Sequence, residues 1–212
     1  MTAFAKRFTD VTVAAILLVI ASPALGVSAL LVRIDSPGPA FYRGVRVGRG
    51  GRTFRIYKLR TMASGAEGAG PAITAGDDIR ITRAGRVLRR MKLDELPQLL
   101  NVLKGEMSLV GPRPEHPDFV QLYDERQRMV LSVRPGITSA ASVRFHDEED
   151  LLRGADVEGD YVKRILPTKL DIDLSYVEHP SLAADVHILL QTAWLVLARL
   201  KPRSRIAATP RT

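Results

Sequence analysis

The sequence predicts an α+β protein that is mainly helical, with a small β-hairpin and a membrane helix near the N-terminus. Three observations support this class. Residues 11–32 form a run of 22 residues without a charge. Residues 41–58 contain alternating strand-like segments around a glycine-rich turn. Three later segments carry apolar residues at helical spacing.

The composition limits what the protein binds and how it is stabilised. The chain has 212 residues, which is enough for one domain, or one domain with a membrane anchor. Its formal charge of +8 favours anionic partners such as nucleotides, nucleic acid or acidic lipids. It contains no cysteine, which excludes disulfides and thiolate metal sites. The four histidines are scattered, without the spacing of metal ligands.

The apolar run is long enough to cross a bilayer but is interrupted at its middle. A straight helix of this length spans about 33 Å, against roughly 30 Å of hydrocarbon. Pro23 has no N–H for the carbonyl of Val19, so we expect a kink there. The hydroxyl of Ser22 is placed to satisfy the freed carbonyl. Each half then reaches about 16 Å, half of the bilayer.

Both flanks of this run are basic. Lys6 and Arg7 precede it, and eight cations against one acid follow between residues 33 and 60. Because basic flanks stay in the cytoplasm, a re-entrant helix satisfies this charge pattern better than a span. An ordinary kinked span is the competing interpretation. A cleaved signal peptide fits less well, since its apolar core covers only about 7–15 residues.

These features divide the chain into three parts. We predict a re-entrant membrane helix over residues 1–35, broken at Ser22-Pro23, and a cytosolic or interfacial catalytic domain over 36–200. The basic residues 201–212 are predicted to form a disordered tail.

The predicted domain begins with the hairpin. Residues 41–58 form its two strands, with the turn at 48–51. Residues 63–76 are rich in glycine and alanine and predict a mobile surface loop that could close over a ligand. Thr82 is placed to cap a short helix that runs to Met91, with Val87 and Leu88 on its apolar face. Pro97 opens a second helix that Gly105 ends.

Residues 182–200 predict a helix that is amphipathic to strongly apolar. Asp185, His187 and Gln191 make it too polar for a confident membrane span. An interfacial helix fits better, with Trp194 at the headgroup level and basic residues near its end facing acidic lipid. An ordinary core helix is the alternative.

Asp94 and Glu95 are the candidate catalytic residues. They stand side by side where a helix is expected to begin, and the partial positive charge of a helix N-terminus keeps a carboxylate ionised and attracts phosphate. An ionised aspartate can attack phosphorus, and carboxylates shared with substrate phosphates suit Mg²⁺. Acids at this position also serve as simple capping charges, which is the structural alternative.

Cations surround this acid pair in the sequence. Arg113 stands between two prolines that stiffen its backbone, and Lys58, Arg60 and Arg80 lie in nearby basic motifs. An arginine fork matches the geometry of phosphate, although each of these cations is also explained as a solvated surface charge. The sequence has no glycine-rich phosphate loop of the Walker or Rossmann type.

Taken in order, these motifs resemble those of the bacterial sugar transferases, and more narrowly the small monotopic polyprenyl-phosphate phosphoglycosyl transferases. The resemblance covers residues 6 to about 138, with a weaker extension at Asp173-x-x-Tyr176. The segments that carry it are Lys6-Arg7-x-x-Asp10, Ser22-Pro23, Ser36-Pro37-Gly38-Pro39, Lys58-x-Arg60-Thr61-Met62, Asp78-x-Arg80-Ile81-Thr82, Leu93-Asp94-Glu95-Leu96-Pro97 and Leu109-Val110-Gly111-Pro112-Arg113-Pro114.

The resemblance implies a two-step transfer at the cytoplasmic face of the bacterial inner membrane. Asp94 would attack a UDP-sugar with the help of Mg²⁺, and polyprenyl phosphate would then take the phosphosugar. Glu95 would support the metal or the leaving group. Asp94 and Glu95 would be the protein ligands of the Mg²⁺ ion. Arg113 would bind phosphate or nucleotide, as would Lys58, Arg60 and Arg80. No nucleic-acid partner is expected.

The chain departs from the family after Arg134-Pro135-Gly136-Ile137-Thr138. Many members continue there with Gly-x-Ala-Gln-Val-x-Gly-Arg, whereas this chain has residues 139–149 of a different and more acidic kind. This region is expected to shape the choice of sugar. The catalytic segment itself shows no departure.

Two other functions are compatible with parts of the pattern. A non-enzymatic, membrane-anchored protein could use the +8 charge to bind acidic lipid or nucleic acid. A membrane-anchored hydrolase would use water in place of the lipid acceptor.

Overall fold

The computed structural model describes residues 3–66, 70, 73–75, 78–152 and 156–200. The predicted tail, 201–212, and parts of the predicted loop at 63–76 lie outside them. Small two-stranded sheets lie among helices, as the sequence predicted for a mainly helical fold. The elements are α1 (Ala3–Asp35), β1 (Phe41–Tyr42), β2 (Val45–Val47), η1 (Arg49–Gly51), β3 (Thr53–Arg55), β4 (Lys58–Leu59), α2 (Arg83–Arg90), η2 (Leu93–Gln98), α3 (Leu99–Lys104), β5 (Ser108–Val110), α4 (Pro117–Gln121), η3 (Gln127–Ser132), β6 (Gly136–Thr138), α5 (Ala140–Arg144), α6 (Glu148–Leu151), α7 (Val157–Asp160), η4 (Tyr161–Ile165), α8 (Leu166–Glu178) and α9 (Leu182–Leu200).

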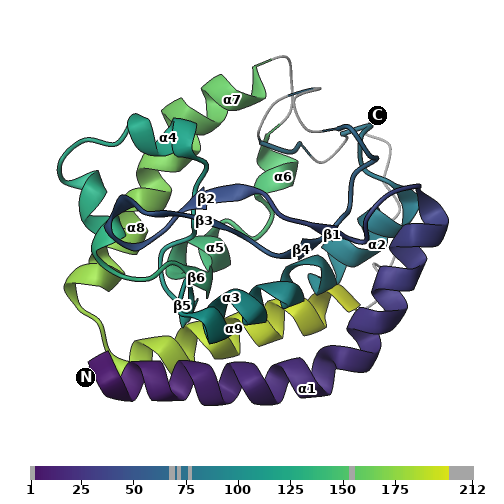
Figure 1. The fold of residues 1–212 in the computed structure, drawn as a ribbon. Coiled ribbons are helices and arrows are strands. Elements are labelled where there is room, and N and C mark those ends of the chain that lie inside the picture. The colour runs from purple at the N-terminus through teal and green to yellow at the C-terminus, as the bar shows by residue number, and fades with distance from the viewer. Residues whose placement is uncertain (1–2, 67–69, 71–72, 76–77, 153–155, 201–212) are drawn as a thin grey trace, which may run out of the picture.

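Helix α1 is long, apolar and bent. Figure 1 shows its first part running along the base of the molecule and its second part rising at the right. Pro23 lies inside the helix, and the Ser22 hydroxyl donates to the Val19 carbonyl at 2.8 Å. That carbonyl is the one that the missing N–H of Pro23 leaves free. The predicted role of Ser22 is therefore confirmed.

The first turns of α1 are fixed to the rest of the protein by polar contacts. Arg7 donates to the carbonyls of Val102 and Leu103 at 2.7 and 3.1 Å, at the end of α3. Buried Asp10 accepts from the Ser108 hydroxyl at 2.8 Å, at the start of β5. Lys6 joins Asp10 to Asp185 of α9 through ion pairs of 3.2 and 2.8 Å. Helix α1 thus contacts the end of α3, the start of β5 and the first turn of α9.

The predicted hairpin forms, although it is split into two short ladders. Strand β1 pairs with β4, and β2 pairs with β3, both antiparallel around the turn η1. The predicted cap of α2 also forms, because the Thr82 hydroxyl accepts from the N–H of Gly85 at 3.0 Å. Val87 was expected on the apolar face of this helix, but it is 56% exposed.

A parallel pair of strands, β5 and β6, lies at the centre of the molecule and was not predicted. Ser108 is opposite Gly136, and Val110 is opposite Thr138. The two chains continue side by side beyond the strands, where the N–H of Gly136 donates to the Pro112 carbonyl at 2.9 Å. A Cβ on Gly111 would lie 2.5 Å from the Arg134 carbonyl oxygen, so this close approach requires glycine. The pair delivers the Gly111-Pro112-Arg113 turn to the site.

Helix α9 follows the predicted bounds and lies against the inner side of α1 (Figure 1). Of the polar residues that made it look unsuited to a span, only Asp185 faces the protein, whereas His187 and Gln191 are exposed. Asp185 is buried and accepts from the Tyr176 hydroxyl, and Thr192 bonds to Thr138 at 2.7 Å. Both α1 and α9 are long and apolar enough to cross a membrane by length and composition.

Candidate active site

The acid pair lies in a tight helical turn. Lys92 adopts a left-handed conformation with φ of 55°, and the 3₁₀ helix η2 begins at the next residue. The sequence predicted that the helix would open at Pro97, and this boundary was wrong. The turn starts four residues earlier because Lys92 redirects the chain, which places Asp94 and Glu95 inside its first turn. Side chains of neighbouring residues diverge by about 120° in such a helix.

Asp94 is buried without a full set of partners. Asp94 is only 7% exposed, and its Oδ1 has no hydrogen-bond partner among the described residues. Burial raises the pKa of Asp94, and the neighbouring charge of Glu95 raises it further, against the opposing charges of Lys58 and Lys92. A buried oxygen without a donor is costly. Oδ1 of Asp94 is therefore free to bind a metal ion or a hydrogen-bond donor of a ligand.

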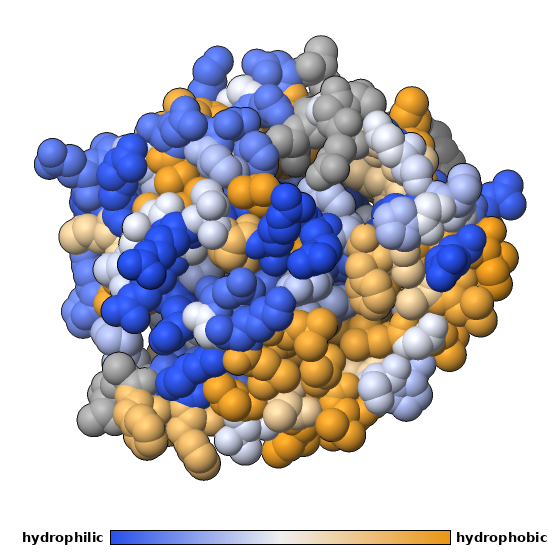
Figure 2. All heavy atoms as spheres, in the orientation of Figure 1, coloured by the Kyte–Doolittle hydropathy of each residue, from blue (hydrophilic) through white to orange (hydrophobic). Residues whose placement is uncertain are grey.

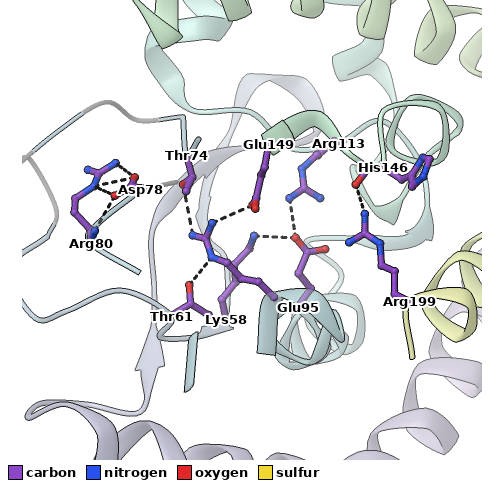
Figure 3. Close-up of polar contacts among 11 residues, drawn as sticks. Lys58, Thr61, Thr74, Asp78, Arg80, Glu95, Arg113, His146, Glu149 and Arg199 are labelled. Carbon is purple, nitrogen blue, oxygen red and sulfur yellow. Dashed lines mark hydrogen bonds and ion pairs between the residues drawn. The ribbon is translucent and has the colours of Figure 1, made fainter. Parts of the chain in front are cut away.

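Glu95 is in the opposite electrostatic situation. Its Oε1 accepts from Lys58 Nζ at 3.0 Å and from Arg113 Nη2 at 2.7 Å (Figure 3). Burial alone would raise the pKa of Glu95, but the charges of Arg113 and Lys58 outweigh it and hold this pKa well below its usual range. Glu95 is thus ionised and fixed in place, and the two acids have different electrostatic roles.

The structure fixes the backbone of Arg113 as well as its side chain. The N–H of Arg113 donates to Asp173 Oδ2 at 3.3 Å, and Asp173 Oδ1 accepts from the N–H of Ala141 at 3.2 Å. Burial raises the pKa of Asp173 to about 6. The motif Asp173-x-x-Tyr176 was visible in the sequence, but nothing in it indicated that the acid holds the arginine turn.

Lys58 and Arg113 therefore converge on Glu95, whereas the other two predicted phosphate-binding residues make different contacts. The buried guanidinium of Arg60 donates to the carbonyls of Pro37 and Ser36 at 2.6 and 2.7 Å, just beyond the end of α1. Arg80 pairs with Asp78 at 2.6 Å, and Figure 3 shows this pair apart from Glu95.

These contacts predict a structural effect for Arg60. Replacing Arg60 by glutamine should destabilise the protein by about 1–3 kcal/mol, because buried carbonyls lose their donor. The KM for the donor should change little. Denaturant titration and donor kinetics measure the two effects, with exposed Arg90→Gln as the control. A large rise in KM without a loss of stability would contradict this assignment.

One further cation reaches the acid pair. Arg89 of α2 donates from Nε to the Thr61 hydroxyl at 2.9 Å and from Nη1 to Glu149 at 3.0 Å. Its charge is among those that oppose the raised pKa of Asp94. Arg89 was not among the site residues predicted from the sequence. Its neighbour in space, Thr61, is 28 residues away in the sequence.

The donor set fits Mg²⁺ that is shared with a substrate. No group of three or more His, Cys, Asp or Glu side chains able to hold a metal occurs among the described residues. Mg²⁺ is commonly held by one or two carboxylates, with substrate phosphates and waters as the other ligands. The unpartnered Oδ1 of Asp94 is such an oxygen, and Glu95 is adjacent.

Comparison with known proteins agrees with the arrangement of these motifs. Residues 1–199 match the family model of the bacterial sugar transferases. The chain is 38% identical over 198 residues to a UDP-N-acetylgalactosamine-undecaprenyl-phosphate N-acetylgalactosaminephosphotransferase of Aeromonas hydrophila, covering 92% of this chain and 44% of the relative. It is 41% identical over 190 residues to a UDP-glucose:undecaprenyl-phosphate glucose-1-phosphate transferase of Caulobacter vibrioides, covering 88% and 67%.

A third relative is nearer in length. The chain is 36% identical over 192 residues to an uncharacterized sugar transferase of Bacillus subtilis, covering 91% of this chain and 87% of the relative. The match to the family model extends over nearly the whole chain and includes every residue of the site described above. The chain therefore belongs to the bacterial sugar transferase family.

Proposed function

We propose that this protein transfers a phosphosugar from a UDP-sugar to polyprenyl phosphate, through a covalent phosphosugar ester of Asp94. The observation that carries the proposal is the acid pair. Asp94 is buried with an oxygen that has no partner among the described residues, next to a glutamate that two half-buried cations hold ionised. The relatives support a UDP-sugar and a polyprenyl phosphate as the two substrates, because their names specify UDP-linked sugars and undecaprenyl phosphate.

In the first step, a carboxylate oxygen of Asp94 attacks the β-phosphorus of the donor. A new P–O bond forms as the bond between this phosphorus and the bridging oxygen breaks, and UMP leaves with the electron pair. Arg113 and Lys58 lie beside the acid pair and supply positive charge where phosphate charge develops. Glu95 holds both cations in position.

In the second step, a phosphate oxygen of the lipid acceptor attacks the same phosphorus. The acyl phosphate bond breaks, Asp94 is released as a carboxylate, and the product is a polyprenyl-diphosphate-sugar. The buried setting of Asp94 limits the access of water to the ester. This burial favours transfer over hydrolysis.

Mg²⁺ is part of the proposal. Asp94 and Glu95 would hold it together with donor phosphates, and when bound it would neutralise phosphate charge at the reacting centre. Asp94 would then lie close to the phosphorus, while Arg113 and Lys58 restrain Glu95.

The exposed apolar surface of the protein supports a location at a membrane. Figure 2 shows hydrophobic side chains gathered along the base and right edge, where Figure 1 places α1. They include Phe4, Phe8, Val19, Ile20, Val27, Leu30 and Ile34 of α1, and α9 adds Leu190, Trp194 and Leu197. Such a surface fits lipid. We place α1 as a re-entrant helix and α9 at the interface, on the cytoplasmic face of the bacterial inner membrane.

The re-entrant topology predicts where the N-terminus lies. A cysteine introduced as Ala3→Cys should not react with an impermeant maleimide added to intact cells. Replacing Pro23 by leucine restores the helical hydrogen bond and straightens α1, so labelling of Ala3→Cys should then increase. Exposed Arg52→Cys serves as the cytoplasmic control and should stay unlabelled in both backgrounds. Labelling of Ala3→Cys with Pro23 intact would exclude the re-entrant topology.

Turnover is the direct test of the proposed function. The purified protein should release UMP from at least one member of a panel of UDP-sugars, and only with Mg²⁺ present. Adding polyprenyl phosphate should yield a lipid-linked sugar. The panel is needed because the relatives are named for different sugars: N-acetylgalactosamine, glucose and galactose. Release of sugar phosphate to water, unchanged by the lipid, would favour a hydrolase.

A further inference from the structure

Three consecutive acids around the start of α6 each pair with a cation from a different element. Asp147 pairs with Arg199 of α9 at 2.8 Å, and Glu148 pairs with Lys169 of α8 at 2.8 Å. Glu149 pairs with Arg89 of α2 at 3.0 Å. These acids lie in the region where the sequence departs from the family pattern. The third pair differs from the others because Arg89 is next to the catalytic segment.

The guanidinium of Arg89 is held by side chains from other segments of the chain. Its Nε donates to Thr61, which lies just beyond the strand that carries Lys58, and Nη1 is directed to Glu149. Figure 3 shows Glu149 paired with Arg89, and Lys58 and Arg113 paired with Glu95. Arg89 acts electrostatically on Asp94 together with Lys58 and Lys92. The cation that Glu149 neutralises therefore belongs to the positive charge beside Asp94, which is suited to an anion.

The geometry points to Arg89 as a further phosphate-binding residue of this site, held in place before substrate binds by the Glu149 carboxylate, which a substrate phosphate oxygen displaces. This inference rests on the proposed function. A carboxylate and a phosphate present similar oxygens to an arginine fork, so one replaces the other without rearranging Arg89. The fixed Nε contact with Thr61 keeps the fork aligned during the exchange.

The pair is weak enough for such an exchange. The side chain of Glu149 is 49% exposed and that of Arg89 is 19% exposed. Ion pairs that are open to water contribute little and are screened by salt. Neutralising Glu149 should therefore tighten phosphate binding by about two- to fivefold, the size of one such pair. Removing Arg89 should weaken binding by about tenfold or more, since a charge-assisted contact is lost.

Calorimetric binding of UDP to the full-length protein with Mg²⁺ tests this inference without turnover. Glu149→Gln should tighten binding, and Arg89→Gln should weaken it. Asp147→Asn is the matched control, because it removes one acid from the same segment at a pair of similar exposure. It should leave binding unchanged. In the Arg89→Gln background, Glu149→Gln should have no further effect, because its influence acts through Arg89.

Equal effects of Glu149→Gln and Asp147→Asn would overturn the inference, since they would reflect net charge alone. So would tightening by Glu149→Gln that persists without Arg89. Repeating the titration with farnesyl phosphate identifies which substrate phosphate contacts Arg89. If the Arg89 and Glu149 variants change the affinity for UDP only, Arg89 binds the donor. If they change the affinity for farnesyl phosphate only, Arg89 binds the acceptor. A wild-type protein that bound neither would contradict the proposed function as well, whereas normal UMP release without these contrasts would sink only the role of Arg89.

Discussion

Replacing Asp94 by asparagine is expected to abolish UMP release while raising the thermal stability of the protein. The loss of activity should reach about 10⁴-fold or more, as for other enzymes that lose their nucleophile. The gain in stability follows from burial, because asparagine does not place an incompletely partnered charge in the interior. A gain of about 1 kcal/mol would raise the melting temperature by about 2–4 °C in a chain of this size.

The stability difference should depend on pH in a defined direction. The folded-state pKa of Asp94 is raised, so the wild-type protein is favoured below pH 3.8 and loses stability as the pH rises through the folded pKa. The asparagine variant lacks this loss. Melting curves should therefore coincide in acid and separate as the pH increases. Mass spectrometry of wild type trapped with donor should locate a phosphosugar on Asp94, and an adduct elsewhere, or turnover by the variant, would refute the covalent role.

Glu95→Gln is expected to have the largest effect on stability. It leaves half-buried Lys58 and Arg113 without their shared carboxylate, which costs about 3 kcal/mol, the low end of the range for fully buried ion pairs. Activity should also fall by about 10²–10³-fold, because both cations lose their positions. Denaturant unfolding and UMP release measure these two losses.

A second substitution separates charge from shape at this pair. Adding Lys58→Met to Glu95→Gln removes one of the two unpaired cations, so part of the lost stability should return while activity stays low. Glu95→Gln should also shift the acidic side of the pH–activity profile to lower pH, because the charge of Glu95 raises the pKa of Asp94. Equal stability of Glu95→Gln and wild type would mean that the observed ion pairs do not hold the site together.

Local features were predictable from the sequence wherever one residue type satisfies a local requirement. Thr82 caps α2, Gly105 ends α3 with φ of 85°, and Ser22 bonds to the carbonyl that Pro23 frees. The hairpin also formed, since its turn residues and alternation act over a few positions. Asp94, Glu95, Lys58 and Arg113 were named in advance because acids and cations recur together in ordered motifs.

Features that depend on distant contacts were not predictable. The parallel pairing of β5 and β6 joins residues 28 positions apart, and nothing local in either strand indicates its partner. Arg60 looked like a phosphate ligand, although its donors meet backbone carbonyls of residues 32–37, and carbonyl groups leave no trace in a sequence. Arg89 was not predicted as a site residue, because its partner Glu149 is 60 residues away in the sequence.

The contacts of Lys6, Arg7 and Asp10 have a practical consequence for anyone preparing this protein. Shortening the gene to begin after residue 35 would not yield a soluble enzyme, because the same deletion strips the end of α3 of its Arg7 donors and Ser108 of its acceptor. It would also uncover the apolar side chains that Ala14 and Val32 shield. The protein therefore has to be purified with α1 intact, in detergent or a lipid nanodisc, because α1 is part of the folded catalytic unit.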